Sequence, residues 1–159
     1  MSKIRRKAGL IIAVGAIILS ACASAPNVDW NLTISGAVSN PLTVSYKDLS
    51  KMPQIDLKDV FMDKSTGEDS TGAWSGVLLD HLLIKAGAAE NYVGITAVAA
   101  DGYAIEITRD ELENAIVALK EDGEWIQNSD PDHGPIRMVC PQTPANRWVF
   151  QLLEIQVNQ

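Results

Sequence analysis

Apolar and polar residues alternate along several short stretches of the chain, and this alternation predicts strands. The first runs are 30–38 and 54–62, and a shorter apolar pair at 42–44 follows a turn. A period of two residues is typical of strands that bury one face. Later runs of similar length are rich in apolar residues and predict five more strands: 93–99, 103–107, 115–119, 136–139 and 148–157.

Helical spacing occurs in fewer places. Apolar residues recur every three or four positions within 77–86, and Gly87 follows where a left-handed helix cap is expected. Short helices are also predicted at 46–49 and after Thr108, where Glu111 stands at the capping-box position. Many short strands with two or three short helices predict a strand-dominated, mixed α+β fold in a single domain.

The N-terminus has the pattern of a targeting segment. An apolar stretch at 10–19 follows four basic residues, and it ends in Leu19-Ser20-Ala21-Cys22. The stretch is too short to span a membrane comfortably, because a spanning helix needs about 20 apolar residues. Small residues directly before a cysteine resemble the lipobox of bacterial lipoproteins, in which the cysteine is lipidated and the chain is cut before it. The alternative is an ordinary secretory signal that is cut shortly after this cysteine.

The lipoprotein interpretation divides the chain into a signal peptide at 1–21, a linker at 22–29 and a domain at 30–158. It predicts an exported protein held on the extracytoplasmic side of a membrane by lipid on Cys22. Removing the signal peptide removes four of the 13 Lys and Arg and none of the 20 Asp and Glu, which leaves a formal charge of −11. Such an acidic domain is unsuited to nucleic acid or to docking on anionic lipid. The other cysteine, Cys140, is left without a disulfide partner.

Short motifs follow one another in a fixed order through the domain. The most specific are Trp-Ser-Gly-Val at 74–77, Asp-Gly-Tyr at 101–103 and Gly-Pro-Ile-Arg-Met-Val at 134–139. Together with the flanking strands, they resemble the molybdopterin-binding oxidoreductase domain of the sulfite oxidase type. The resemblance covers nearly all of 30–158. It implies the fold of that family and makes molybdopterin the candidate cofactor.

Trp74, Ser75 and Gly76 form the first candidate binding segment. Gly76 permits a close backbone approach, and Ser75 can cap the helix that is expected to follow. The free N–H groups of a helix N-terminus suit a cofactor that carries a phosphate. The alternative is a strand-to-helix corner with Trp74 in the core. Tyr103, where the chain re-enters the sheet, is a second candidate ligand-binding residue.

Arg137 and Arg147 are the third candidates, and they flank the loop 140–146. Two guanidinium groups that converge on one loop can hold a phosphate through paired hydrogen bonds. In so acidic a domain they suit structural ion pairs equally well, and the carboxylates considered as partners are Glu106, Asp110 and Glu154. By the resemblance, Arg137 lies in the segment that lines the pterin site of the family.

One expected ligand is missing. In catalytic members of the family, the pterin dithiolene and one protein thiolate hold the metal, and that cysteine precedes the Trp-Ser-Gly segment. Residues 55–73 contain no cysteine, and neither serine nor aspartate replaces a soft thiolate. Cys140 would serve only if the fold brought it to the same place. Asp130, Asp132 and His133 offer oxygen and nitrogen ligands, but a solvated turn explains this loop better. We therefore expect no protein-held metal.

Three functions follow from these observations. The sequence favours a lipid-anchored domain that binds an anionic small ligand or a protein partner without redox catalysis. The second function is an active molybdenum or tungsten pterin oxidoreductase with an unusual ligand set that includes Cys140. The third is a structural or assembly lipoprotein whose fold supports only protein contacts.

Overall fold

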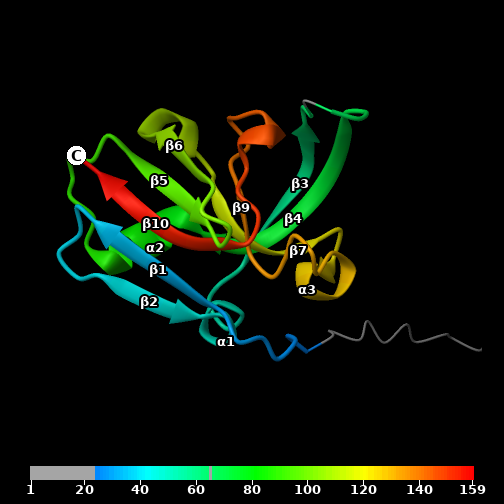
Figure 1. The fold of residues 1–159 in the computed structure, drawn as a ribbon, viewed down its shortest axis with the longest axis horizontal. Coiled ribbons are helices and arrows are strands. Elements are labelled where there is room, and N and C mark those ends of the chain that lie inside the picture. Colours follow the sequence, from blue (N-terminus) through cyan, green and yellow to red (C-terminus); the bar gives the residue numbers. More distant parts are fainter. Residues whose placement is uncertain (1–23, 65) are drawn as a thin grey trace, which may run out of the picture.

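The structure is a computed structural model that describes residues 24–64 and 66–159. The expected signal peptide and Cys22 lie outside the described residues. Within them, two β-sheets lie side by side along the long axis of the molecule (Figure 1). The prediction of a strand-dominated single domain with short helices is confirmed.

The first sheet joins the two ends of the domain. Its strands run in the order β2–β1–β10–β5–β6, with these bounds: β2 (Leu42–Ser45), β1 (Asn31–Gly36), β10 (Leu152–Asn158), β5 (Gly94–Ala99) and β6 (Ala104–Thr108). The pairing of β1 with β10 is parallel, whereas the other neighbours pair antiparallel. Just before β1, the indole N–H of Trp30 donates to the carbonyl oxygen of Leu152 at 2.8 Å. The last strand of the domain, β10, is the middle strand of this sheet, and the first strand, β1, lies directly beside it.

The second sheet is antiparallel and carries the segments that surround the candidate site. Its strands run in the order β3–β4–β7–β8, and β9 also pairs with β7. The bounds are β3 (Ile55–Met62), β4 (Ser70–Leu78), β7 (Ile116–Glu121), β8 (Glu124–Trp125) and β9 (Arg137–Val139). Strands β3 and β4 are consecutive along the chain and pair antiparallel as a hairpin.

Short helices and turns connect several of the strands along the chain. They are α1 (Tyr46–Leu49), α2 (Leu79–Ala86) and α3 (Ile126–Ser129), with two 3-10 turns, η1 (Arg109–Leu112) and η2 (Ala145–Arg147). Helix α2 buries Leu79, Leu82, Leu83 and Ala86, as its spacing predicts. Gly87 caps it in the left-handed conformation at φ 66°, and the capping box of Thr108 and Glu111 is present. The local start and stop signals of the sequence are thus confirmed.

The main correction concerns Trp74, Ser75 and Gly76, which lie in the middle of β4. Helix α2 begins at Leu79 with Leu78 as its N-cap, so the prediction that Ser75 caps this helix is wrong. Pairing on both sides keeps the segment extended, because Ser75 faces Asp56 of β3 and Lys120 of β7. These backbone partners outweigh the helical spacing that follows the segment.

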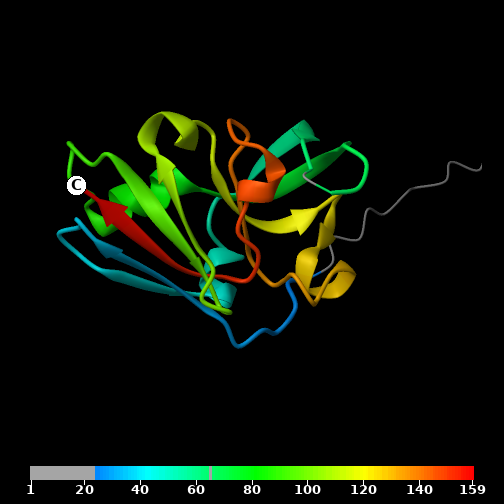
Figure 2. The same ribbon diagram turned by 45° about the horizontal axis from the view of Figure 1, so that its top comes forward.

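The segment after β9 crosses between two distant parts of the chain. In both views the orange turn η2 lies between η1 and the hairpin of β3 and β4 (Figures 1 and 2). The N–H of Ala145 donates to the carbonyl of Asp63 at 3.0 Å, and Arg147 forms an ion pair with Glu111 of η1.

Among the described residues, no helix is long and apolar enough to cross a bilayer.

Candidate functional site

A groove opens where the β3–β4 hairpin, the end of β7, β9 and η2 come together. We call it the Arg137 groove, and its volume is about 590 Å³. Its apolar lining comes from Met62, Ala145, Trp148 and Phe150, and its charged or titratable lining from Lys64, Glu121, Asp122, Asp130, His133 and Arg137. A smaller hollow of about 370 Å³, lined by Tyr103 among others, shares Phe150, Trp148, His133 and Asn146 with it. The two spaces therefore have a common aromatic wall.

Arg137, on β9, is the central side chain of the groove and is only 6% exposed. Its guanidinium lies between two rings, 4.9 Å from the centroid of Trp74 and 4.2 Å from that of Phe150. Nη2 donates to Asp130 at 3.1 Å and Nη1 to Glu121 at 3.4 Å. Nε is buried and has no hydrogen-bond partner among the described residues. Arg137 is thus held on four sides by the protein itself.

Burial and neighbouring charges shift the pKa values of Arg137 and Glu121 in opposite directions. Burial lowers the pKa of Arg137, and the carboxylates of Glu121 and Asp130 act in the opposite direction. Burial raises the pKa of Glu121, although the charge of Arg137 partly offsets this effect. Because buried charges need partners, this arrangement favours an ion-paired arginine over one that is free to bind an anion.

His133 and Phe150 form the exposed rim of the groove. The imidazole Nδ1 of His133 lies 2.9 Å from the nearer carboxylate oxygen of Asp130, and its ring packs 4.9 Å from that of Phe150. Phe150 is 40% exposed, so part of its ring is accessible at the rim of the groove. Of the three loop residues considered as metal ligands, Asp130 and His133 lie together. The third, Asp132, accepts a hydrogen bond from the side chain of Gln151 through its backbone carbonyl.

Of the first candidate segment, only Trp74 is close to the groove. It is fully buried, touches Arg137 and packs edge-on against Trp148, with ring centroids 5.6 Å apart. The hydroxyl of Ser75 donates to Asp56 on β3 at 2.6 Å. Gly76 allows β4 to approach β7, because a Cβ there would collide with the carbonyl oxygen of Val117. The close backbone approach expected of Gly76 is therefore present, and it serves strand packing.

The two predicted arginines do not converge. Arg147 forms an ion pair with Glu111 of η1 and donates to the carbonyl of Glu106 at 2.9 Å, and it does not line the groove. Of the two interpretations, the structure contains the ion pairs, but the partners are Glu121 and Asp130 for Arg137 and Glu111 for Arg147. The expected carboxylate partners, Glu106, Asp110 and Glu154, are therefore wrong. Tyr103 lies in the adjoining hollow and is 47% exposed.

Cys140 lies in the core. Its side chain is 0% exposed, and burial raises the pKa of its thiol to about 12. Its backbone carbonyl accepts hydrogen bonds from Thr143 and from the indole of Trp148. It lines neither the Arg137 groove nor the hollow beside it. In the described part of the chain, no group of three or more His, Cys, Asp or Glu side chains is placed to hold a metal ion.

Sequence reasoning missed Phe150, Glu121 and Lys64. Phe150 falls where an alternating strand was expected, but residues 148–151 precede β10 and turn the ring outward to the groove. Glu121 is the last residue of β7, and the pairing of β7 with β9 brings its carboxylate within 3.4 Å of Arg137. Phe150 lies in the apolar run Trp-Val-Phe-Gln-Leu-Leu at 148–153, so nothing in the sequence pattern distinguishes it from its buried neighbours.

Comparison with known proteins gives consistent matches. Residues 21–159 match the family described as "Oxidoreductase molybdopterin binding domain". Nitrate reductase [NADH] of Volvox carteri is 28% identical over 174 aligned positions, which cover 86% of this chain and 20% of that protein. The "Uncharacterized oxidoreductase YuiH" of Bacillus subtilis (strain 168) is 27% identical over 115 positions, which cover 70% of this chain and 57% of that protein. The chain thus spans a fifth to just over half of the length of these relatives.

A solved structure supports the fold. The sulfane dehydrogenase SoxCD from Paracoccus pantotrophus superposes with a TM-score of 0.73 at 20% sequence identity. The superposition covers 86% of this chain and 40% of the SoxCD chain. Together with the family match over 21–159, it identifies this chain as a member of the oxidoreductase molybdopterin binding domain family.

Proposed function

We propose that this protein is an exported, lipid-anchored domain of molybdopterin-oxidoreductase type whose Arg137 groove binds a small organic ligand without a thiolate-held metal. The part of the proposal that excludes a thiolate-held metal rests on Cys140, which is fully buried and has a raised thiol pKa. A thiol that is neither accessible nor readily ionised is a poor metal ligand. Family membership supplies the fold, but the chemistry depends on the residues of the site.

The residues present do not fit the cofactor that the family implies. A phosphate group needs free cations, but Glu121 and Asp130 engage the two Nη atoms of Arg137, and Glu111 engages Arg147. Lys64 is the one cation of the groove lining that forms no ion pair among the described residues. Asp122 adds a further acidic group to the lining of the groove. The metal of the family needs a thiolate, and the one thiol of the described chain is in the core. We therefore derive no redox step through molybdopterin.

The groove favours a planar, uncharged ligand over the anionic one that the sequence led us to expect. Phe150 presents exposed aromatic surface at the shared wall of the two spaces, whereas Trp148 is only 3% exposed there. Aromatic faces bind planar rings through stacking. Thr66, Ser70 and Thr71 also line the groove, and their hydroxyl groups can orient such a ring through hydrogen bonds.

Analysis of the purified protein for metal and retained ligand tests this function. The protein is expressed in a molybdenum-replete host, and native mass spectrometry is combined with elemental analysis. We expect no stoichiometric molybdenum, tungsten or cofactor phosphorus, and a retained organic ligand that Phe150→Ala reduces. Phe61→Ala is the matched control, because Phe61 is also exposed but does not line the groove. Stoichiometric metal would establish the oxidoreductase instead, and the absence of any ligand would favour a purely structural lipoprotein.

The anchor has its own test. Cys22→Ala removes the thiol that the acyl chain would modify, while it leaves the described domain intact. We expect the variant to lose the mass of the lipid and to leave the membrane fraction. Membrane association that survives the substitution would contradict the lipid anchor.

A further inference from the structure

A second groove lies beside the free edge of β3, and none of its lining residues lines the Arg137 groove. Its volume is about 600 Å³, and six consecutive residues of β3, 56–61, line it together with the segment 141–144. Because successive side chains of a strand point to opposite faces of the sheet, a hollow on one face would touch only every second residue. The groove therefore runs along the edge of the strand, and we call it the β3-edge groove.

The outward-facing backbone of β3 is unpaired within the described residues. An antiparallel neighbour uses only alternate N–H and C=O groups of a strand, so β4 leaves the other half pointing away from it. Apart from this ladder, residues 55–62 form no backbone hydrogen bond to the rest of 24–64 or 66–159. The groove thus presents a row of main-chain donors and acceptors.

The segment across the groove supplies few partners for this row. Pro141 and Pro144 have no N–H, and Thr143 donates its N–H to the carbonyl of Cys140 at 3.0 Å. The bond from Ala145 to the carbonyl of Asp63 falls just beyond the end of β3. The chain therefore approaches β3 here without pairing with it.

The other edge strands of the described chain are shorter or occupied. On β6, the carbonyl of Glu106 accepts a hydrogen bond from Nη2 of Arg147 at 2.9 Å. Strand β2 has four residues and directly follows Pro41, and β8 has two. Strand β3 has eight. A long exposed edge is a template for pairing with another chain.

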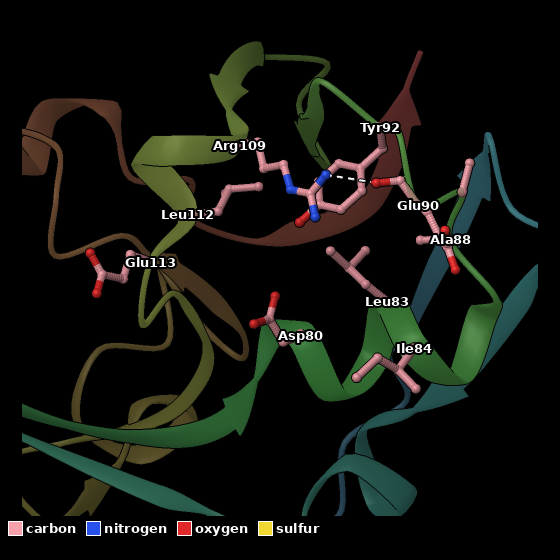
Figure 3. Close-up of a pocket in the computed structure, with 10 residues that line it drawn as sticks. Asp80, Leu83, Ile84, Ala88, Glu90, Tyr92, Arg109, Leu112 and Glu113 are labelled. Carbon is pink, nitrogen blue, oxygen red and sulfur yellow. Dashed lines mark hydrogen bonds between the residues drawn. The ribbon is translucent and has the colours of Figure 1, made fainter.

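The pocket between α2 and η1 provides a contrast (Figure 3). Its one cation, Arg109, lies 4.5 Å from the centroid of the Tyr92 ring and donates to the carbonyl of Glu90 at 2.7 Å. Its lining contains no strand residue, so it offers no comparable row of backbone groups.

The side chains of the β3-edge groove indicate which strand would complement it. The inward-facing Leu57 and Val60 are half-buried and buried. The exposed charged residues of the lining are three acids and one base: Asp56, Asp59, Asp63 and Lys58. None of these four forms an ion pair among the described residues. An added strand places its side chains directly opposite those of its neighbour. Apolar residues would therefore extend the inner row, and basic residues would extend the outer row.

We propose that the β3-edge groove binds an extended segment of a partner protein, which adds to the sheet as a strand beside β3 and carries basic residues on its outward face. Main-chain hydrogen bonds supply the attraction in this kind of recognition, and alternate side chains supply the selectivity. The bulge between Leu57 and Val60, where Asp59 has φ 54°, restricts the register. The bulge and Lys58 also discourage indiscriminate pairing, so the partner is a specific segment.

Hydrogen exchange of the full-length protein in neutral detergent micelles locates the added strand. The probe is the peptide acetyl-Lys-Val-Lys-Val-Lys-amide, whose residues alternate between basic and apolar. The outward-facing amides of Ile55–Met62 should exchange at least about tenfold more slowly with the peptide bound, because they gain hydrogen-bond partners. The amides of β6 are the internal reference and should not change.

Backbone methylation of the peptide separates strand pairing from charge attraction. Two versions carry N-methyl groups on the lysines or on the valines, and both keep the charge of the parent peptide. The N–H groups of alternate residues point to opposite edges of a strand, so only one version presents its methyl groups to β3. In calorimetric titration, we expect one version to bind like the parent and the other to lose at least about tenfold in affinity.

Substitutions test the outer row. Asp56→Asn/Asp59→Asn should weaken binding about fivefold, as expected for two exposed charge pairs. Asparagine tolerates the left-handed conformation of residue 59. The control Glu68→Gln/Glu124→Gln removes two charges from exposed residues outside the groove, and it should change binding by less than about 1.5-fold because of salt screening. Circular dichroism and thermal unfolding check that each variant is folded.

Four results would overturn the proposal: no binding of the parent peptide, unchanged exchange of β3 with the peptide bound, equal affinities of the two methylated versions, or equal weakening by the control double variant. The first result would leave the bulge and Lys58 as protection of an edge that pairs with nothing. None of these results depends on metal content or on ligand retention in the Arg137 groove. Failure of this proposal is therefore distinguishable from failure of the proposed function.

Discussion

Arg137 and Arg147 belong to the same part of the chain but to different environments. The side chain of Arg137 is 7% exposed and lies between two rings and two carboxylates. That of Arg147 is 30% exposed and connects η2 to Glu111 of η1. Arg137 is packed like a core residue, whereas Arg147 joins two surface turns. Two residues that look alike in the sequence thus perform different structural tasks.

This difference shows that the partners of an arginine define its role more than its neighbours in the sequence do. Arg137 occupies the position that the family resemblance connects with a pterin, but here two carboxylates neutralise it. Arg147 is accessible enough to exchange partners with solvent. Neither guanidinium is therefore free of carboxylate partners when an anion approaches.

The strongest test of the comparison is Arg137→Met. The substitution leaves Glu121 and Asp130 without their cation, and we expect the free energy of unfolding to fall by about 2–4 kcal/mol. The estimate is below that for a fully buried pair because these carboxylates are 27% and 35% exposed. Urea unfolding followed by circular dichroism measures it. A loss below about 1 kcal/mol would place Arg137 in the same class as a surface arginine.

Arg147→Met is the matched variant. Because its pair with Glu111 is partly exposed, the expected loss is at most about 1 kcal/mol. The same urea experiment applies, and the ratio of the two losses is the informative quantity. If Arg147→Met cost as much as Arg137→Met, the distinction between a core and a surface arginine would fail.

The smallest expected effect is a difference in pH dependence. The hydrogen bond from Arg147 lowers the pKa of Glu111 to about 2 from its usual 4.5, so its stabilising contribution is present above pH 4.5 and is lost as the pH falls toward 2. Burial raises the pKa of Glu121, so its contribution is largest below 4.5 and is lost as the pH rises through the raised value.

Urea unfolding at several pH values compares Glu111→Gln and Glu121→Gln with the unsubstituted protein. The deficit of Glu111→Gln should shrink toward acid, whereas Glu121→Gln should compare best with the unsubstituted protein at neutral pH and worst in acid. Parallel trends for the two variants would show that the two carboxylates do not differ in environment.

Most of the local structure could be predicted from the sequence. Alternation located most strands within a few residues, and Gly87 and the pair of Thr108 and Glu111 marked the end of one helix and the start of a turn. These signals act over three or four residues, so they are visible without the fold. The error at Ser75 arose because two flanking strands determine the conformation of β4, and their contribution cannot be read locally.

The site was less predictable for the same reason. Trp74 and Arg137 were separate candidate residues in the sequence, and only the fold brings them into contact. The carboxylates that pair with Arg137 come from β7 and from the loop after α3, which pairing between strands brings together. Counting charges along the chain could not distinguish them from the many other acidic residues. The burial of Cys140, in contrast, agreed with its apolar sequence context.

The parallel pairing of β1 with β10 has a mechanical consequence. Tension applied through the residues before Trp30 would pull along β1, which hydrogen bonds hold on both sides to β2 and β10. Such a load shears many bonds at once and does not peel them apart in succession. The indole of Trp30, bound to the carbonyl of Leu152, would carry part of that load first. A domain attached by this end can thus resist a pulling force without losing the strands of the sheet one at a time from its edge.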